Sequence, residues 1–230
     1  MCIRDSFYSE EEIIVTNGAS EALDTSLRSI IEPGDDILIP GPIYAGYIPL
    51  VETLGGNPVY IDTTQSDFKV TPKLIESHLT HKTKAILLNY PTNPTGVILE
   101  RSEVKNIVDT LVNKHIFIIS DEIYAENTFK GQHTSFAEFP EIRDQLLLIG
   151  GLSKSHSATG IRIGFLLGPE YLIEKLTFMH AYNCICANVP AQIACTTALN
   201  EGINAPLYMN RDYIEPVSYT HLTLPTKRIV

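Results

Sequence analysis

Short, almost wholly apolar runs recur along the chain and alternate with stretches that have helical periodicity. The clearest runs lie at residues 36–39, 84–88, 116–119 and 146–149. Nearly continuous apolar content is typical of strands that are covered on both faces. Strands of this kind, separated by helices, predict an α/β fold with a mostly parallel sheet and helices on both faces.

The intervening stretches carry the helix signals. Residues 19–31 place apolar side chains at helical spacing, and Pro33-Gly34 ends the pattern. Similar signals predict a helix that runs through residue 54 and helices near 71–79, 101–113, 171–182 and 190–201. Further strands are expected at 12–16, 58–61 and 163–167.

Composition limits the classes of protein to which the chain can belong. A length of 230 residues fits one large domain or two small ones. The formal net charge of -10 argues against a nucleic-acid partner, because binding to phosphate backbones relies on excess lysine and arginine. No apolar run approaches the roughly 18 residues that span a bilayer, and the charged start of the chain lacks the apolar core of a secretory signal. These features predict a cytoplasmic protein without a membrane partner.

The cysteines are Cys2, Cys184, Cys186 and Cys195. The Cys184-x-Cys186 pair could suggest a metal or redox site. However, this spacing directs the two side chains apart on a helix, and no second pair of ligands follows. We therefore expect reduced structural thiols and no bound metal.

Polar, chemically capable segments follow several of the predicted strands. Asn17-Gly-Ala-Ser20 follows the first strand, residues 89–96 and 120–124 follow two later ones, and a turn containing Lys154 follows residue 149. In open α/β sheets, ligands bind outside the carboxyl ends of the strands. These segments are therefore expected to meet at one edge of the sheet.

Lys154 and Arg162 suggest which ligand binds there. A lysine in a Ser/Gly-rich turn is sterically open, and near other cations or in a dry pocket its amine becomes a nucleophile toward carbonyl carbons. Arg162 supplies a planar, permanent cation suited to a phosphate. The pair suggests pyridoxal phosphate, with Lys154 as its Schiff-base lysine, although an isolated Ser-Lys pair is more often a solvated loop lysine.

A family resemblance accompanies these residues. Thr-Asn-Gly-Ala-Ser-Glu-Ala at 16–22, Asn-Tyr-Pro-Thr-Asn-Pro-Thr-Gly at 89–96, Ser-Asp-Glu-Ile-Tyr at 120–124 and the segment 153–162 occur in this order. Together they resemble the class I and II aminotransferases, which are pyridoxal-phosphate enzymes of the aspartate aminotransferase fold. The similarity runs from about residue 11 to residue 213. Within the family, the chain looks closest to bacterial aromatic or N-acetyl-diaminopimelate aminotransferases.

The resemblance implies a reaction and a set of partners. Enzymes of this family move an amino group from an amino acid to a 2-oxo acid by a ping-pong mechanism through a lysine Schiff base, here Lys154. The same lysine moves the proton of the substrate Cα atom. The resemblance also implies pyridoxal 5'-phosphate as cofactor and a homodimer as the full-length enzyme. Residues 186–192 resemble a segment that family dimers place between subunits.

The resemblance also assigns roles to individual residues. Asp121 would pair with the pyridine nitrogen, and Tyr124 and Asn93 would donate to the phenolic oxygen of the ring. Lys154, Asp121 and Tyr124 are thus the expected catalytic residues. The expected cofactor-binding residues are Ala19, Ser20, Tyr44, Asn93, Asp121, Tyr124, Ser153, Lys154 and Arg162, with Ala19, Ser20 and Arg162 on the phosphate and Tyr44 stacked on the ring.

Each role has a plainer alternative. Gly-Ala-Ser at 18–20 is also a simple helix start, Asp121 and Glu122 could be carboxylates at the start of a helix, and Tyr44 could be an ordinary core tyrosine. His156 is expected to be a structural loop residue. The Asn93–Pro94 peptide bond is expected to be cis.

The chain also departs from the family pattern. Gly151 stands where many relatives carry a serine that contacts the phosphate. By resemblance, relatives are much longer, with a substrate-carboxylate arginine in a C-terminal small domain and an N-terminal arm that completes the neighbouring subunit's site, and we expect both regions to be missing here. Residues 1–6 and 216–230 look like translated adapter sequence, which leaves 7–215 as a partial cofactor-binding large domain.

Rival functions stay open at this point. A carbon-sulfur β-lyase would share the same cofactor pocket. A regulator domain could bind the cofactor without turnover, and a fragment without its substrate arginine could be inert. The donor amino acid is not indicated by the sequence.

Overall fold

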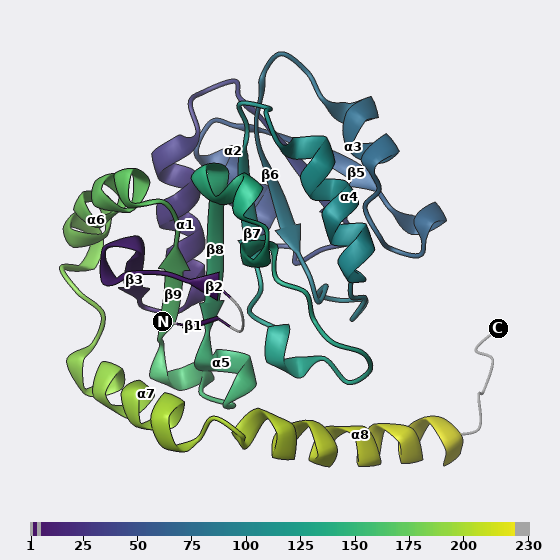
Figure 1. Ribbon diagram of the computed structural model, residues 1–230, viewed down its shortest axis with the longest axis vertical. Coiled ribbons are helices and arrows are strands. Elements are labelled where there is room, and N and C mark those ends of the chain that lie inside the picture. The colour runs from purple at the N-terminus through teal and green to yellow at the C-terminus, as the bar shows by residue number, and fades with distance from the viewer. Residues whose placement is uncertain (1, 4–5, 224–230) are drawn as a thin grey trace.

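A computed structural model describes residues 2–3 and 6–223 and shows a central sheet with helices on both faces (Figure 1). The sheet has seven strands in the order β3-β9-β8-β7-β6-β4-β5, and β1 and β2 form a separate two-stranded sheet. This architecture confirms the predicted α/β class and the mostly parallel sheet.

The strands are short, as their apolar runs predicted. They are β1 (Cys2–Ile3), β2 (Ser6–Phe7), β3 (Ile13–Thr16), β4 (Asp36–Gly41), β5 (Asn57–Asp62), β6 (Thr83–Asn89), β7 (Phe117–Asp121), β8 (Leu146–Gly151) and β9 (Gly164–Leu167).

The α-helices are α1 (Ala19–Ile30), α2 (Tyr47–Thr53), α3 (Pro72–His78), α4 (Arg101–Leu111), α5 (Leu152–Ser155), α6 (Glu170–Cys184), α7 (Val189–Glu201) and α8 (Ala205–Thr223). Short 3-10 turns η1 to η6 lie at Glu10–Glu12, Thr64–Ser66, Ala125–Asn127, Phe136–Glu138, Pro140–Gln145 and Thr159–Ile161. Every strand and helix predicted from the sequence is present, displaced by at most a few residues.

Strand direction determines which loops meet. Strands β4 to β8 pair in parallel along the sheet. Strand β9 is antiparallel to both β8 and β3, so β3 runs in the same direction as β8. The carboxyl ends of β3, β6, β7 and β8 therefore meet at one edge, and β9 begins at that edge. This placement confirms the predicted convergence of the strand-end loops.

Neighbouring residues on a strand supply opposite layers of the core, because successive side chains point to opposite faces of a sheet. In β4, Leu38 belongs to the layer that α4 covers, while Ile37 and Ile39 belong to the layer that α1 covers. These three side chains are fully buried. Because an apolar layer covers each face of the sheet, side chains on both faces of a strand are apolar. The strands therefore appear in the sequence as continuous apolar runs.

Helix α1 packs on the sheet through the predicted stripe. Leu23, Leu27 and Ile30 are buried in the same core layer as Ile37. The helix ends before Pro33, and its first turn lies at the edge where β9 begins, since Gly164 approaches Gly18 and Ala19 closely. The packing of α1 thus directs its N-terminus toward the strand-end loops.

The last two helices follow one side of the molecule (Figure 1). Together with α5, helices α7 and α8 enclose an apolar cavity of about 370 Å³, which Leu152, Ala194 and Met209 help to line. The sequence did not predict α8, which continues through residue 223. Residues 1, 4–5 and 224–230 lie outside the described residues, so the assignment of 1–6 and 216–230 as foreign sequence stays a prediction.

Within residues 2–3 and 6–223, no helix combines the length and the apolar character that crossing a membrane requires.

Candidate active site

Lys154 lies in α5, the single helical turn that directly follows β8. Its side chain is half-buried and lines a cavity of about 1060 Å³. The Nζ atom lies over the ring of Tyr124, 5.5 Å from its centre. The amine is therefore positioned at the wall of a cavity, in agreement with the predicted accessible lysine.

The same cavity brings together predicted residues from separate segments. Asn93 comes from the loop after β6, Tyr124 from the loop after β7, and Ser153 from α5 beside Lys154. Residues 127–130 and Tyr213 of α8 contribute further parts of the wall. Four of the predicted site residues thus face one space large enough for a cofactor-sized ligand.

Arg162 packs against the N-terminus of α1. Its Nη2 donates to the Asn17 carbonyl oxygen at 3.3 Å, and its Nη1 donates to the Thr159 carbonyl oxygen at 2.9 Å. A Cβ atom at Gly18 would lie 2.3 Å from Nη2, so glycine is what allows the guanidinium to come this close. Because a helix N-terminus presents unpaired N–H groups and positive dipole charge, Arg162 and α1 together form a cradle suited to a phosphate.

We expect Gly18→Ala to lower the free energy of unfolding by about 1–3 kcal/mol. Gly18 has φ 86° and ψ 165°, a conformation that alanine rarely adopts, and the new Cβ would overlap the Arg162 guanidinium. Urea denaturation measures the change. Gly160→Ala is the matched control, because no atom lies within 4 Å of a Cβ at Gly160. Equal effects of the two substitutions would contradict the tight packing of Arg162 on Gly18.

Asp121, the last residue of β7, is buried and hydrogen-bonded through both oxygens. Its Oδ2 accepts from the Tyr47 hydroxyl at 2.7 Å, and its Oδ1 accepts from the Ile123 backbone N–H at 3.1 Å. Burial raises the pKa of the Asp121 carboxyl, and these two hydrogen bonds act against the rise. A buried carboxyl of this kind would favour a ligand that offers a positively charged N–H, as a protonated pyridine does.

Tyr47 was not among the residues predicted for the site. It is the first residue of α2, its side chain is buried, and its ring meets that of Tyr44 edge to face with centroids 5.4 Å apart. Burial and the neighbouring Asp121 raise the pKa of the Tyr47 phenol, so its hydroxyl remains a hydrogen-bond donor. The sequence signal was faint, since Tyr47 lies 74 residues from Asp121.

Tyr44 is 51% exposed, so the alternative reading of an ordinary core tyrosine is wrong. The Tyr44 ring contacts the ring of Tyr47, and the Tyr47 hydroxyl in turn donates to Asp121. The role of Tyr44 as a stacking partner for a cofactor ring stays a prediction.

Asn89 connects Asp121 and Asn93, two residues predicted for the site. A role for Asn89 itself was not predicted from the sequence. Its Nδ2 donates to the Asp121 carbonyl oxygen at 2.9 Å, and its Oδ1 accepts from the Asn93 backbone N–H at 3.0 Å. The Asn93–Pro94 peptide bond is cis, as predicted. Asn89 therefore ties the loop that carries Asn93 to the strand that carries Asp121.

Gly151 shows why a serine is absent at this position. A Cβ atom there would lie 2.9 Å from the Ile163 carbonyl oxygen and 3.1 Å from the Gly164 Cα atom. Strands β8 and β9 approach too closely at this point for a side chain without a shift of the backbone. Hydroxyl donors near the cradle must therefore come from other positions, such as Ser20.

Glu122 has a structural environment distinct from that of Asp121. It is buried, accepts from the Ser120 hydroxyl and the Phe136 backbone N–H at 3.0 Å each, and lies 2.7 Å from His133 Nε2. The next helical turn begins only at Ala125. The alternative that Asp121 and Glu122 start a helix is therefore wrong.

His156 links the Lys154 turn to the end of α7. Its Nδ1 lies 2.9 Å from Ser155 Oγ, and its Nε2 lies 3.2 Å from the Gly202 carbonyl oxygen. These contacts agree with the predicted structural role.

The remaining predicted residues, Ala19, Ser20, Tyr44, Asp121 and Arg162, do not line the large cavity. The sheet nevertheless places them at the same edge. Asp121 pairs with Ile149 across β7 and β8, and Gly151 pairs with Gly164 across β8 and β9. Asp121, Lys154 and Arg162 therefore come from the ends of three adjacent strands, while their individual roles stay predictions.

Comparisons with known proteins agree on one family. The family described as aminotransferase class I and II matches residues 4–215. A probable N-acetyl-LL-diaminopimelate aminotransferase of Bacillus subtilis is 44% identical over 216 residues, which is 94% of this chain and 54% of that protein. An aspartate aminotransferase of Geobacillus stearothermophilus is 37% identical over 90% of this chain and 53% of its own length. The chain thus spans about half the length of the curated relatives it matches.

Solved structures show the same relationship. The aspartate aminotransferase of Thermotoga maritima superimposes with a TM-score of 0.86 at 32% identity, covering 92% of this chain and 56% of that one. The aromatic aminotransferase of Pyrococcus horikoshii gives a TM-score of 0.85 at 31% identity, covering 89% of this chain and 56% of that one.

Proposed function

The chain belongs to the class I and II aminotransferase family, whose members depend on pyridoxal phosphate, and we propose that residues 7–215 form the cofactor-binding large domain of such an enzyme. The complete enzyme would move an amino group from an amino acid to a 2-oxo acid. One observation carries this proposal: Asp121, Lys154 and Arg162 lie at the ends of the adjacent strands β7, β8 and β9.

Arg162 and the N-terminus of α1 would hold the phosphate. The guanidinium already contacts Gly18, and the first N–H groups of α1 lie beside it. Ala19 and Ser20 begin that helix, and the Ser20 hydroxyl can add a donor. This group of residues would fix one end of the cofactor.

Asp121 would hold the other end. Pyridoxal phosphate, when bound, supplies a carbonyl carbon and an electron-withdrawing ring that stabilises negative charge on a substrate Cα atom. An ionised Asp121 would keep a proton on the ring nitrogen, and Tyr47 holds the Asp121 carboxyl in place through its hydrogen bond to Oδ2. Tyr124 and Asn93, on the cavity wall, would donate to the phenolic oxygen of the ring.

Lys154 would act between these two ends. Its Nζ lies at the cavity wall and can attack a carbonyl carbon, take the proton from the substrate Cα atom and return it elsewhere. The turn that carries the amine is anchored to Gly202 through His156.

The substrates follow from the same site. We propose an amino acid donor and a 2-oxo acid acceptor, and we leave the donor side chain open. The relatives named above are called a probable N-acetyl-LL-diaminopimelate aminotransferase, aspartate aminotransferases and an aromatic aminotransferase, so their names do not agree on one donor.

Exposed apolar side chains favour a homodimer as the complete enzyme. On α6 and α7 and between them, Phe178, Tyr182, Ile185 and Ile193 are between 65% and 90% exposed. Residues 186–192 lie within this stretch. Large apolar side chains that are exposed in one stretch of chain are a feature of subunit interfaces.

We also place the protein in the cytoplasm. Three of its cysteines, Cys184, Cys186 and Cys195, are free thiols, as is usual in a reducing compartment.

The proposal is tested by adding pyridoxal phosphate to the purified chain, followed by an amino acid. We expect one cofactor to bind per chain with a new visible absorption, and a 2-oxo acid to form in a single turnover with retention of the amino group on the cofactor. Formation of pyruvate from cystathionine without amino transfer would identify a lyase instead. Absence of cofactor binding would overturn the proposal.

A further inference from the structure

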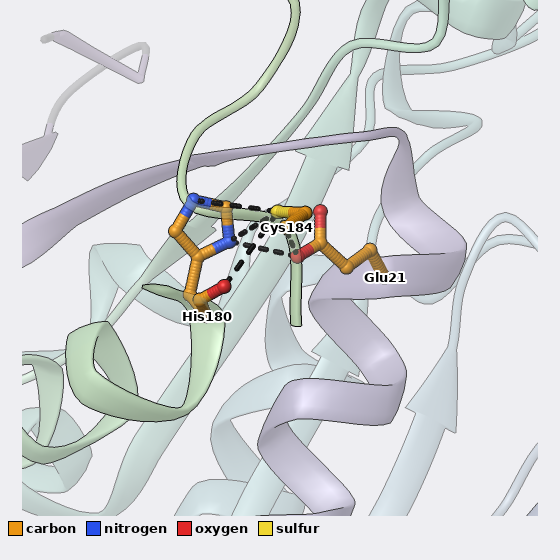
Figure 2. Close-up of side chains that lie close together, drawn as sticks. All are labelled: Glu21, His180 and Cys184. Carbon is orange, nitrogen blue, oxygen red and sulfur yellow. Dashed lines mark hydrogen bonds and ion pairs between the residues drawn. The ribbon is translucent and has the colours of Figure 1, made fainter. Parts of the chain in front are cut away.

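Glu21, His180 and Cys184 form a compact cluster that the proposed function does not use. Glu21 lies in the first turn of α1, and His180 and Cys184 lie four residues apart at the C-terminal end of α6. Residues four apart share a face of a helix, so the imidazole and the thiol both point toward Glu21 (Figure 2). None of the three lines the large cavity.

The donor atoms of the cluster are close together. Glu21 Oε1 lies 2.7 Å from His180 Nδ1 and 3.2 Å from Cys184 Sγ, and the sulfur lies 3.5 Å from Nδ1. Bond lengths to tetrahedral zinc place ligand atoms about 3.3–3.6 Å apart. The two separations that involve sulfur are near this range, and the third needs to open by about 0.6 Å as the hydrogen bond gives way to a metal.

Glu21 is oriented toward the cluster by a contact outside it. Its second oxygen, Oε2, accepts from the Asn17 backbone N–H at 2.5 Å, which leaves Oε1 to face His180 and Cys184. The Glu21 and His180 side chains are only 15% and 8% exposed. Such outer contacts fix the orientation of the ligands in metal sites.

We propose that Glu21, His180 and Cys184 form a binding site for a zinc-type divalent ion. A carboxylate oxygen, an imidazole nitrogen and a thiolate sulfur match the ligand preferences of Zn²⁺, and three protein ligands leave a fourth position for water. A plain ion pair would account for Glu21 and His180 alone, whereas the thiol of Cys184 joins them by donating to Glu21 Oε1 at 3.2 Å, besides its contact with the His180 carbonyl oxygen at 3.6 Å.

Metal binding has to displace two hydrogens from the cluster: the thiol proton of Cys184, which is released to water, and the hydrogen that His180 Nδ1 donates to Glu21, which moves to Nε2 or to water. Burial, together with the hydrogen bond and charge of Glu21, raises the pKa of the Cys184 thiol to about 11, so the thiol is protonated without metal. A coordinated thiol is deprotonated by the charge of the ion. The sequence suggested only structural thiols here, because Glu21 lies 159 residues from His180 in the chain.

The test uses the full 230-residue chain, freed of metal with a chelator and kept reduced, without pyridoxal phosphate. Zinc affinity is measured by competition with a chromophoric chelator. We expect one zinc ion per chain and a loss of affinity of about 100-fold or more in Cys184→Ser. The control is Cys186→Ser, which removes an exposed neighbouring thiol and should leave the affinity unchanged.

Cobalt gives a second readout on the unmodified chain. Co²⁺ bound at this site should show a sulfur-to-cobalt charge-transfer band in the near ultraviolet, and Cys186→Ser should keep it. Equal zinc affinity in the wild type and Cys184→Ser, or bound cobalt without this band, would overturn the proposal.

His180→Gln replaces Cys184→Ser as the comparison variant if circular dichroism shows the serine variant unfolded. None of these readouts depends on the cofactor, so a chain that binds pyridoxal phosphate but no zinc refutes only the metal site.

Discussion

Lys154→Ala is expected to abolish the visible absorption that pyridoxal phosphate gains on the wild-type chain. The rate of amino-group transfer should also fall by about 10²–10⁴-fold in the variant, because a positioned proton-transfer group contributes a factor of this size. We expect this loss because of where the Lys154 amine lies. It is on the turn that directly follows β8, over the Tyr124 ring at the cavity wall. Absorption spectra of the two proteins with added cofactor make the comparison.

Lys130→Ala is the matched control, because Lys130 lines the same cavity on a different loop. The Lys130→Ala variant should keep the visible absorption that pyridoxal phosphate gains on the wild-type chain. Borohydride treatment of the loaded wild type, followed by peptide mapping, should then locate the cofactor on Lys154. Identical spectra for the wild type and Lys154→Ala, or a label on Lys130, would refute the role of Lys154.

Asp121→Asn and Arg162→Gln are expected to separate the two ends of the cofactor site. Asp121→Asn removes the charge that we propose for the ring nitrogen and should weaken pyridoxal phosphate binding by about 10–100-fold, the equivalent of one charged hydrogen bond. It should leave the affinity for inorganic phosphate nearly unchanged. Arg162→Gln should weaken both ligands to a similar degree, because it removes the cation beside the α1 N-terminus.

Competition between inorganic phosphate and pyridoxal phosphate measures both affinities on each variant. Tyr47→Phe is a useful companion, since it removes only the hydroxyl that Asp121 accepts from. It should weaken pyridoxal phosphate binding less than Asp121→Asn does. A loss of phosphate affinity in Asp121→Asn as large as in Arg162→Gln would contradict the separation of the two ends.

Much of the fold could be predicted because the information is local. Continuous apolar content in β4 and β6 to β8 reflects burial on both faces, and the stripe of Leu23, Leu27 and Ile30 reflects one buried helix face. The direction of the last strand was not predictable in this way. Strand β9 runs antiparallel to its neighbours, and this reversal is what brings Arg162 to the same edge as Lys154.

Site residues that lie in a recognisable motif could be predicted from the sequence. The residues that hold them in place through hydrogen bonds could not. Tyr47 and Asn89 act on Asp121 through contacts that span 74 and 32 residues. Neither residue type is unusual at its place in the sequence. The cluster of Glu21, His180 and Cys184 is hidden for the same reason, since only the packing of α6 against α1 brings the three together.

Gly151 illustrates a different limit. The sequence shows a missing serine, but only the structure supplies the reason, which is the approach of Ile163 and Gly164 to within contact distance of any Cβ placed there. Helix α8 was missed because its residues carry no clear amphipathic pattern. Exposed Leu207 and Tyr208 in that helix show why, since apolar side chains there do not mark a buried face.

A crystal structure of the chain soaked with pyridoxal phosphate tests the central claim most directly. We expect the phosphate between Arg162 and the N-terminus of α1, the ring nitrogen at the Asp121 carboxylate, and the cofactor carbonyl carbon joined to Lys154 Nζ. Density for the cofactor at another lysine, or a phosphate away from Arg162, would contradict it.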